Sequence, residues 1–111
     1  MGKLLLALIF VLILAASAFA DGSYEAKTID NTSGGVALTA ATYGSARAAL
    51  CRLETGPIRF TKDGSTAPTA DVGIPLYPLE WIILENQGEI RNFRGFRTTA
   101  TSGSLKCFYL P

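Results

Sequence analysis

The stretch ALCRLETGPIRFTKDG, residues 49–64, contains two alternating runs of apolar and polar side chains separated by a breaker. In the first run one parity holds Ala49, Cys51 and Leu53, and the other holds Leu50, Arg52 and Glu54. Alternation with a period of two is typical of a β-strand that buries one face. The Thr-Gly-Pro breaker and the Asp-Gly pair both favour turns. This stretch therefore predicts two short strands followed by a hairpin turn.

Similar runs recur along the rest of the chain. The predicted strands are 24–29, 36–39, 47–54, 58–61, 72–77, 79–85, 93–98 and 104–110. Segment 40–49 is rich in alanine but is interrupted by Gly44, and we expect it to be a loop or the entry to a strand. Seven or eight short strands with turns between them indicate an all-β fold, a small antiparallel β-sandwich or jelly roll.

The first twenty residues have the pattern of a secretory signal. Lys3 precedes an apolar run over residues 4–14, and the segment ends in Ala18-Phe19-Ala20. We expect a signal helix over residues 1–20 and cleavage after Ala20. The alternative is a retained membrane anchor, because residues 4–20 reach the short limit of the roughly 17–25 residues that span a bilayer. Residues 21–111 then form a single domain that is secreted, periplasmic or held at the cell surface.

Composition excludes several classes of function. Loss of Lys3 leaves nine basic and nine acidic side chains, so non-specific electrostatic binding to nucleic acid is not expected. Contact with a membrane is expected only if the first segment is retained. The chain has no histidine, which removes the usual general base of catalysis. No phosphate-binding loop or zinc spacing occurs. We therefore predict a protein that is not an enzyme and that has no metal or cofactor.

The two cysteines fall on the more apolar parity of their strands. In SLKCFYL, Cys107 groups with Leu105 and Tyr109, opposite Lys106 and Phe108. Export to an oxidising compartment favours a disulfide between Cys51 and Cys107. Two separate buried thiols are the alternative.

Segment LEWIILE, residues 79–85, is apolar on both faces. Leu79, Trp81 and Ile83 share one parity, and we expect Trp81 in the core because of its large apolar area. The opposite parity holds Glu80, Ile82 and Leu84. Since one face of a sandwich strand is usually polar, this second face predicts contact with a partner, either a second copy of the chain or another structural protein.

Phe93 and Phe96 have opposite parities in the next predicted strand. Strict alternation cannot bury both, so Gly95 between them predicts a β-bulge that resets the register. We include both phenylalanines among the candidate interface residues.

The Asp-Gly loop offers oxygen atoms from Asp63 and Asp71, but it lacks the acidic spacing of an EF-hand, and we interpret it mainly as a turn. Together with Tyr77 and Trp81, these two aspartates are candidate contacts for a glycan or a cell surface.

Three stretches carry a resemblance to a known group of proteins: IRFTKDGSTAPTADVGIPL, EIRNFRGFR and TSGSLKCFYLP. Together they resemble small β-sandwich proteins encoded among the structural genes of tailed bacteriophages. The first stretch alone is similar to the hairpin of chitobiase C-terminal type modules. The resemblance implies a structural or assembly module, virion-associated or exported, and the alternative is a secreted module that binds carbohydrate or a cell surface. The signal segment and the cysteines depart from the phage pattern and favour an exported form.

Overall fold

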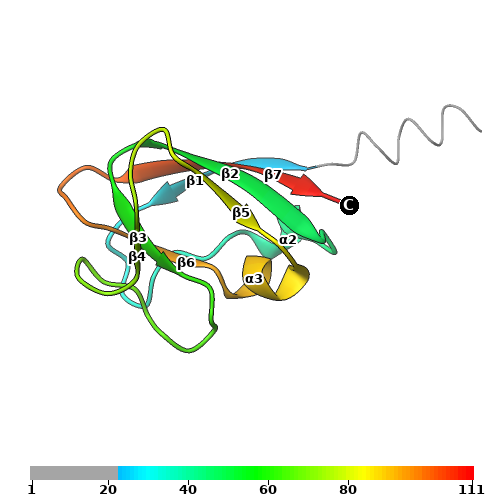
Figure 1. Cartoon of the computed structure of the whole chain (residues 1–111), viewed down its shortest axis with the longest axis horizontal. Helices are drawn as coiled ribbons and strands as arrows, with labels where there is room; N and C mark the ends of the chain where they lie inside the picture. The colour runs from blue at the N-terminus through cyan, green and yellow to red at the C-terminus, as the bar shows by residue number, and fades with distance from the viewer. Residues whose placement is uncertain (1–22) are drawn as a thin grey trace, which may run out of the picture.

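The computed structural model describes residues 23–111, so the predicted signal segment and its cleavage site lie outside the described residues. Seven strands form two antiparallel sheets (Figure 1). The four-stranded sheet has the order β1 (Tyr24–Ile29), β7 (Gly103–Leu110), β2 (Ala48–Thr55) and β5 (Trp81–Leu84). The three-stranded sheet has the order β4 (Ile74–Leu76), β3 (Ile58–Thr61) and β6 (Arg94–Arg97). The prediction of a mainly β fold with two antiparallel sheets is confirmed, and two short helices accompany the sheets.

The core lies between the sheets and receives side chains from both. Leu53, Leu105 and Tyr109 enter it from the four-stranded sheet, and Ile58 and Phe60 enter it from the other. All five are at most 6% exposed. Apolar burial from both layers is the main stabilisation available to so small a domain.

Two short helices lie toward the end of the four-stranded sheet at which β7 finishes (Figure 1). Helix α2 (Ala40–Tyr43) occupies the segment predicted as a loop or strand entry. Helix α3 (Gln87–Asn92) begins at Asn86, whose side chain accepts a hydrogen bond from the Glu89 amide at 2.9 Å. The Glu89 carboxylate in turn accepts one from the Glu85 amide at 2.8 Å. These bonds satisfy amide groups that have no partner within the helix.

The predicted bulge at Gly95 is wrong. Phe93 is the residue that ends α3 and does not belong to the strand, so the two phenylalanines need not follow one alternation. The β3–β6 register runs without interruption from Ile58 opposite Arg97 to Thr61 opposite Arg94. Phe93 is fully buried and stacks on Phe60, with their ring centroids 5.8 Å apart.

Cys51 and Cys107 form the predicted disulfide. They lie directly opposite each other in the β2–β7 register, with a Cα–Cα distance of 4.1 Å, and both are fully buried. The bond therefore joins two neighbouring strands of one sheet.

The predicted orientation of 79–85 is reversed in the structure. The β2–β5 register places Ile82 opposite Cys51 and Leu84 opposite Ala49, both of which face the core. Leu84 is accordingly fully buried and Ile82 packs against the core. Trp81 is 56% exposed and is not a core residue, and Ile83 is 60% exposed.

Candidate docking surface

An apolar row crosses the outer face of the four-stranded sheet. The pairing registers place Tyr24 opposite Phe108, Phe108 opposite Leu50, and Leu50 opposite Ile83. Their parity is opposite to that of the disulfide cysteines, so these side chains point away from the core. Tyr24 and Phe108 are 48% and 54% exposed, and their ring centroids are 5.1 Å apart. One row of four apolar side chains thus spans the whole width of the sheet.

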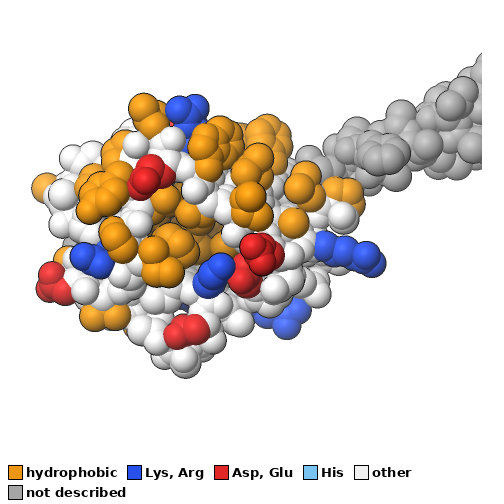
Figure 2. Space-filling model, viewed as in Figure 1, with side chains coloured by type: hydrophobic (Ala, Val, Ile, Leu, Met, Phe, Trp, Pro, Cys, Tyr) orange, Lys and Arg blue, Asp and Glu red, His pale blue; other side chains and the backbone are white. Residues whose placement is uncertain are grey.

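Two more large side chains extend this row along the strands. Leu110, 48% exposed, follows Phe108 by two residues on β7, and Trp81 precedes Ile83 by two on β5. We call the six side chains the apolar band: Tyr24, Leu50, Trp81, Ile83, Phe108 and Leu110. Figure 2 shows hydrophobic side chains gathered on the upper part of the molecule, over the strands of this sheet. An exposed apolar patch of this kind is typical of a contact surface.

On one side of the apolar row, the outer face of the four-stranded sheet carries charged side chains. Lys106 and Arg52 lie opposite each other in the β2–β7 register, next to the apolar row. The Arg52 guanidinium carbon is 5.4 Å from the centroid of the Trp81 ring, which is a cation–π contact. Lys106 Nζ is 3.7 Å from a carboxylate oxygen of Glu54. A charged margin therefore adjoins the band on the side of Arg52 and Lys106.

The residues predicted as an interface do not form one surface. Leu84 and Phe93 are fully buried, and Phe96 is partly buried on β6 in the other sheet. Glu80 is exposed, and its carboxylate accepts a hydrogen bond from the Tyr77 amide at 2.7 Å, which closes the turn before β5. The exposed apolar residues of β5 are instead Trp81 and Ile83.

Most of the band could have been found from alternation alone. Once the cysteines are assigned to the core, Leu50 and Phe108 must face outward, because each is adjacent in sequence to one of them. What the sequence does not show is that these two residues are paired and that Tyr24 and Ile83 continue the same row.

The predicted glycan contacts fall into two places. Tyr77 is 58% exposed and follows the end of β4 that pairs with Ile58, the first residue of β3. Asp63 and Asp71 belong to loop 62–73, which joins the end of β3 to the start of β4. This loop lies at the other end of the β3–β4 pair from Tyr77. The two aspartates and the two aromatic residues therefore do not converge on one site.

Asp63 is the anchor of a turn, as predicted. Its carboxylate accepts hydrogen bonds from the amides of Ser65 and Thr66, at 3.1 and 3.0 Å, and from the Thr66 hydroxyl at 2.6 Å. The bond from the Thr66 hydroxyl, followed by the two amide bonds, holds the pKa of Asp63 well below its usual range. Gly64 supplies the positive φ of 78° that the turn requires. The turn opens the longer loop 62–73 and does not lead directly into β4.

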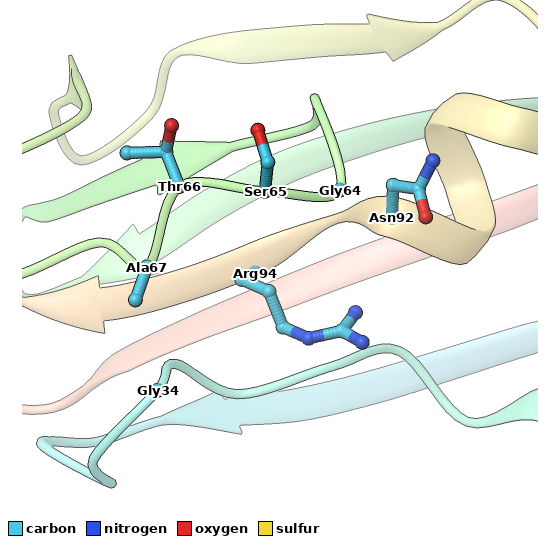
Figure 3. A pocket seen from close by; sticks show the side chains of 7 residues that line it. All are labelled: Gly34, Gly64, Ser65, Thr66, Ala67, Asn92 and Arg94. Atoms are coloured by element: carbon cyan, nitrogen blue, oxygen red, sulfur yellow. The ribbon is translucent and has the colours of Figure 1, made fainter.

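A small polar hollow lies beside this turn (Figure 3). Its volume is about 180 Å³, below the roughly 300–1,000 Å³ that is typical of pockets for drug-sized ligands. Asn92 from the end of α3 and Arg94 from β6 face the loop residues here. Arg94 already donates to the backbone carbonyl oxygens of Arg91 and Phe93, at 3.1 and 2.7 Å. This geometry gives no reason to prefer the hollow to the apolar band as a binding site.

Comparison of the chain with protein-family models, with curated proteins and with solved structures found no match. Within residues 23–111, no group of three or more histidine, cysteine, aspartate or glutamate side chains is placed to hold a metal ion. None of the helices in the described part is both long enough and apolar enough to cross a membrane.

Proposed function

We propose that this chain is a non-enzymatic structural module, exported or virion-associated, that assembles with protein through its apolar band. The observation that carries the proposal is the apolar row in register across all four strands, in which Tyr24, Ile83 and Phe108 are 48%, 60% and 54% exposed. Hydrophobic side chains in a continuous row lose their contact with water only when another surface covers them.

The composition of the band supports a protein partner. Interfaces between proteins are enriched in tyrosine, tryptophan, phenylalanine and arginine, and their binding energy is concentrated in such residues near the centre. The band holds Tyr24, Trp81 and Phe108, and Arg52 packs over the Trp81 ring. A rigid sheet presents these side chains with little loss of entropy on binding.

The compartment is part of the same proposal. The buried disulfide suits an oxidising environment, and the signal pattern supports export. The resemblance to small phage sandwich proteins supports a place on a virion, where such modules would pack on larger assemblies.

The proposal is tested by one substitution on each sheet. Ile83→Lys places a charge in the band, and Ile74→Lys places the same charge on β4 of the other sheet, where Ile74 is 53% exposed. The full chain is expressed in the cells or phage-producing culture from which it comes, and the size of the species that contains it is measured by sedimentation, from the single chain up to particles and the cell envelope. We expect wild type and Ile74→Lys to sediment in a species larger than the single chain, and Ile83→Lys to sediment as the single chain. Equal distribution of all three would refute docking through the band.

A glycan-binding role is the second candidate, and the exposure of Tyr77 and Trp81 favours it, at 58% and 56%. Aromatic rings at a surface can stack on sugar rings, although Arg52 already lies over the Trp81 ring. Titration of the full chain with soluble polysaccharides should then change the fluorescence of Trp81, the single tryptophan of the chain. A spectrum that stays constant to saturating polysaccharide removes this candidate.

A further inference from the structure

We infer that the partner of the apolar band is a second copy of this chain, with the two four-stranded sheets packed face to face. The inference rests on the proposed function, assembly through the band, and names the partner. It deepens that proposal because a symmetric pair needs no other protein to cover the band.

The shape of the band fits a symmetric contact. Its central row runs perpendicular to the strands and spans all four of them, from Tyr24 on one edge to Ile83 on the other. A twofold axis along this row brings the row of one copy onto the row of the next, so that its four apolar side chains meet their counterparts. Sheets pack in this way at a spacing of about 10 Å, with side chains of the two faces interdigitated.

The area of the band reaches the size that a specific dimer needs. A large aromatic side chain buries about 150–250 Å² when it is fully covered, so a half-exposed one still offers about 100 Å². Five band side chains are 48% to 60% exposed, and Leu50 is partly exposed. The band thus offers about 600 Å² per copy and about 1,200 Å² for the pair, the lower limit of standard interfaces at about 1,200–2,000 Å².

The charges at the margin have both signs, as at the rim of a contact between proteins. Arg52 and Lys106 are accompanied on the same outer face by Glu54, which pairs with Lys106 at 3.7 Å. In a symmetric pair this mixed margin lies beside the central row, with Lys106 across from Leu110 of the second copy, and the charged ends of its side chains reach water at the edge of the contact.

The three-stranded sheet offers no equivalent row among the described residues. In its β4–β3–β6 register Arg59 lies between Pro75 and Phe96. The Arg59 guanidinium group donates to the carbonyl oxygens of Ala70 and Gly73, at 3.1 and 2.8 Å. A charged side chain bonded to its own loop occupies the centre of that face, so we assign self-association to the four-stranded sheet alone.

The test measures the association of the purified chain with itself. The full sequence is expressed with export, the product is characterised by intact mass, and sedimentation equilibrium is recorded over a wide concentration range. We expect a monomer–dimer equilibrium for wild type and for the control Ile74→Lys. Because a symmetric dimer contains each substitution twice, Ile83→Lys and Phe108→Lys should each raise the dimer Kd by about 1,000-fold.

Trp81 gives an independent readout in the same samples. It is 56% exposed in the single copy and would be covered in the dimer, so its emission should shift to longer wavelength on dilution, in step with dissociation. Far-ultraviolet circular dichroism of each variant establishes that the fold is kept. Phe108→Lys serves as the second variant if Ile83→Lys does not fold.

The outcomes separate this inference from the proposed function. The wild-type chain could stay monomeric at every concentration and still sediment with larger assemblies in its producing culture, with that sedimentation lost in Ile83→Lys. This result would overturn the inference of a dimer and leave docking through the band intact. Binding of the monomer to phosphatidylcholine–phosphatidylglycerol vesicles, lost in Ile83→Lys, overturns the inference in favour of lipid. If Ile83→Lys and Ile74→Lys behave alike in every assay, both proposals fail.

Discussion

Tyr109 is the side chain in which burial and hydrogen bonding are most closely linked. It is 1% exposed, and its hydroxyl donates to the Glu25 carboxylate. The same carboxylate oxygen accepts a hydrogen bond from the Thr39 amide at 3.0 Å, which ties the segment before α2 to β1. Burial, and then the adjacent carboxylate, raise the pKa of Tyr109 well above its ordinary value of 10.0. The tyrosine therefore stays protonated in the folded chain at pH values where it ionises in the unfolded chain.

This difference predicts a loss of stability in alkali. Above pH 10 the unfolded chain binds fewer protons at Tyr109 than the folded chain, so the free energy of unfolding falls as the pH rises, by up to about 1.4 kcal/mol per pH unit. Below pH 10 the group is protonated in both states and contributes no slope. Urea unfolding between pH 8 and about pH 11 should show a steeper decline for wild type than for Tyr109→Phe. Equal slopes for wild type and Tyr109→Phe would contradict the assignment.

Replacement of Asp63 should loosen its own turn without unfolding the rest of the domain. Its carboxylate holds the amides of Ser65 and Thr66, so Asp63→Ala should release both and speed their hydrogen exchange, as measured by NMR. Asp71 lies in the same loop, and its carboxylate accepts no hydrogen bond within residues 23–111. Asp71→Ala is therefore the matched control and should leave the two amides protected. Protection that survives in Asp63→Ala would mean that the loop holds its shape by other contacts.

At the level of elements, the pair β2–β7 has the longest register in the structure, from Ala48 opposite Leu110 to Thr55 opposite Gly103. The disulfide joins its middle. Replacement of both cysteines, in Cys51→Ala/Cys107→Ala, should lower the free energy of unfolding by on the order of 4 kcal/mol, because the unfolded chain regains the entropy of a loop that is closed at a sequence separation of 56. Urea unfolding measures the change, and a reductant should destabilise wild type without affecting the double variant. A loss well under 1 kcal/mol would show that the ladder alone holds the two strands.

The strands could be predicted because most of them bury one face only. Alternation in 24–29 and 104–110 matches β1 and β7 almost residue for residue, and the inward parity of the cysteines predicted their bond. Strand β5 has apolar residues at both parities, so periodicity cannot decide which side faces the core. The register with β2 decides it, and register depends on pairing between segments distant in sequence. The continuity of the band, from Tyr24 to Ile83, was missed for the same reason, although the outward parity of Leu50 and Phe108 follows from alternation.

The helices were missed for a different reason, because one of them carried a readable signal. Asn86 and Glu89 have the spacing of a capping box, in which Asn at the first position and Glu three residues later satisfy free amides. Recognition of that pair would have moved Phe93 from a strand to a helix end and removed the need for a bulge. Helix α2 has no side-chain cap and only four residues, so the sequence offered little to find.

For the whole molecule, the two sheets depend on one core. Phe93 stacks on Phe60 of β3, and Leu53 and Leu105 belong, with Ile58 of β3, to one buried cluster in which the two layers approach each other closely. Gly103 permits this close approach, because a Cβ at that position would lie 2.6 Å from Ile58 Cγ2. The inner face of each sheet packs against the other sheet in this one core, so neither sheet should remain folded when the other is lost.

A shared core predicts a single cooperative unfolding transition. In increasing urea, brief hydrogen–deuterium labelling followed by mass spectrometry should give the same midpoint for peptides from β3 and β6 as for peptides from β2 and β7, and the midpoint should agree with that of circular dichroism. If the chain pairs through the band, the common midpoint should also rise with total protein concentration, since dissociation and unfolding are then coupled. Ile83→Lys should remove the concentration dependence and keep the coincidence, whereas Ile74→Lys should keep both. Earlier exchange in β3 and β6 would contradict the single core, because it would mean that the four-stranded sheet and its disulfide stand without the second layer.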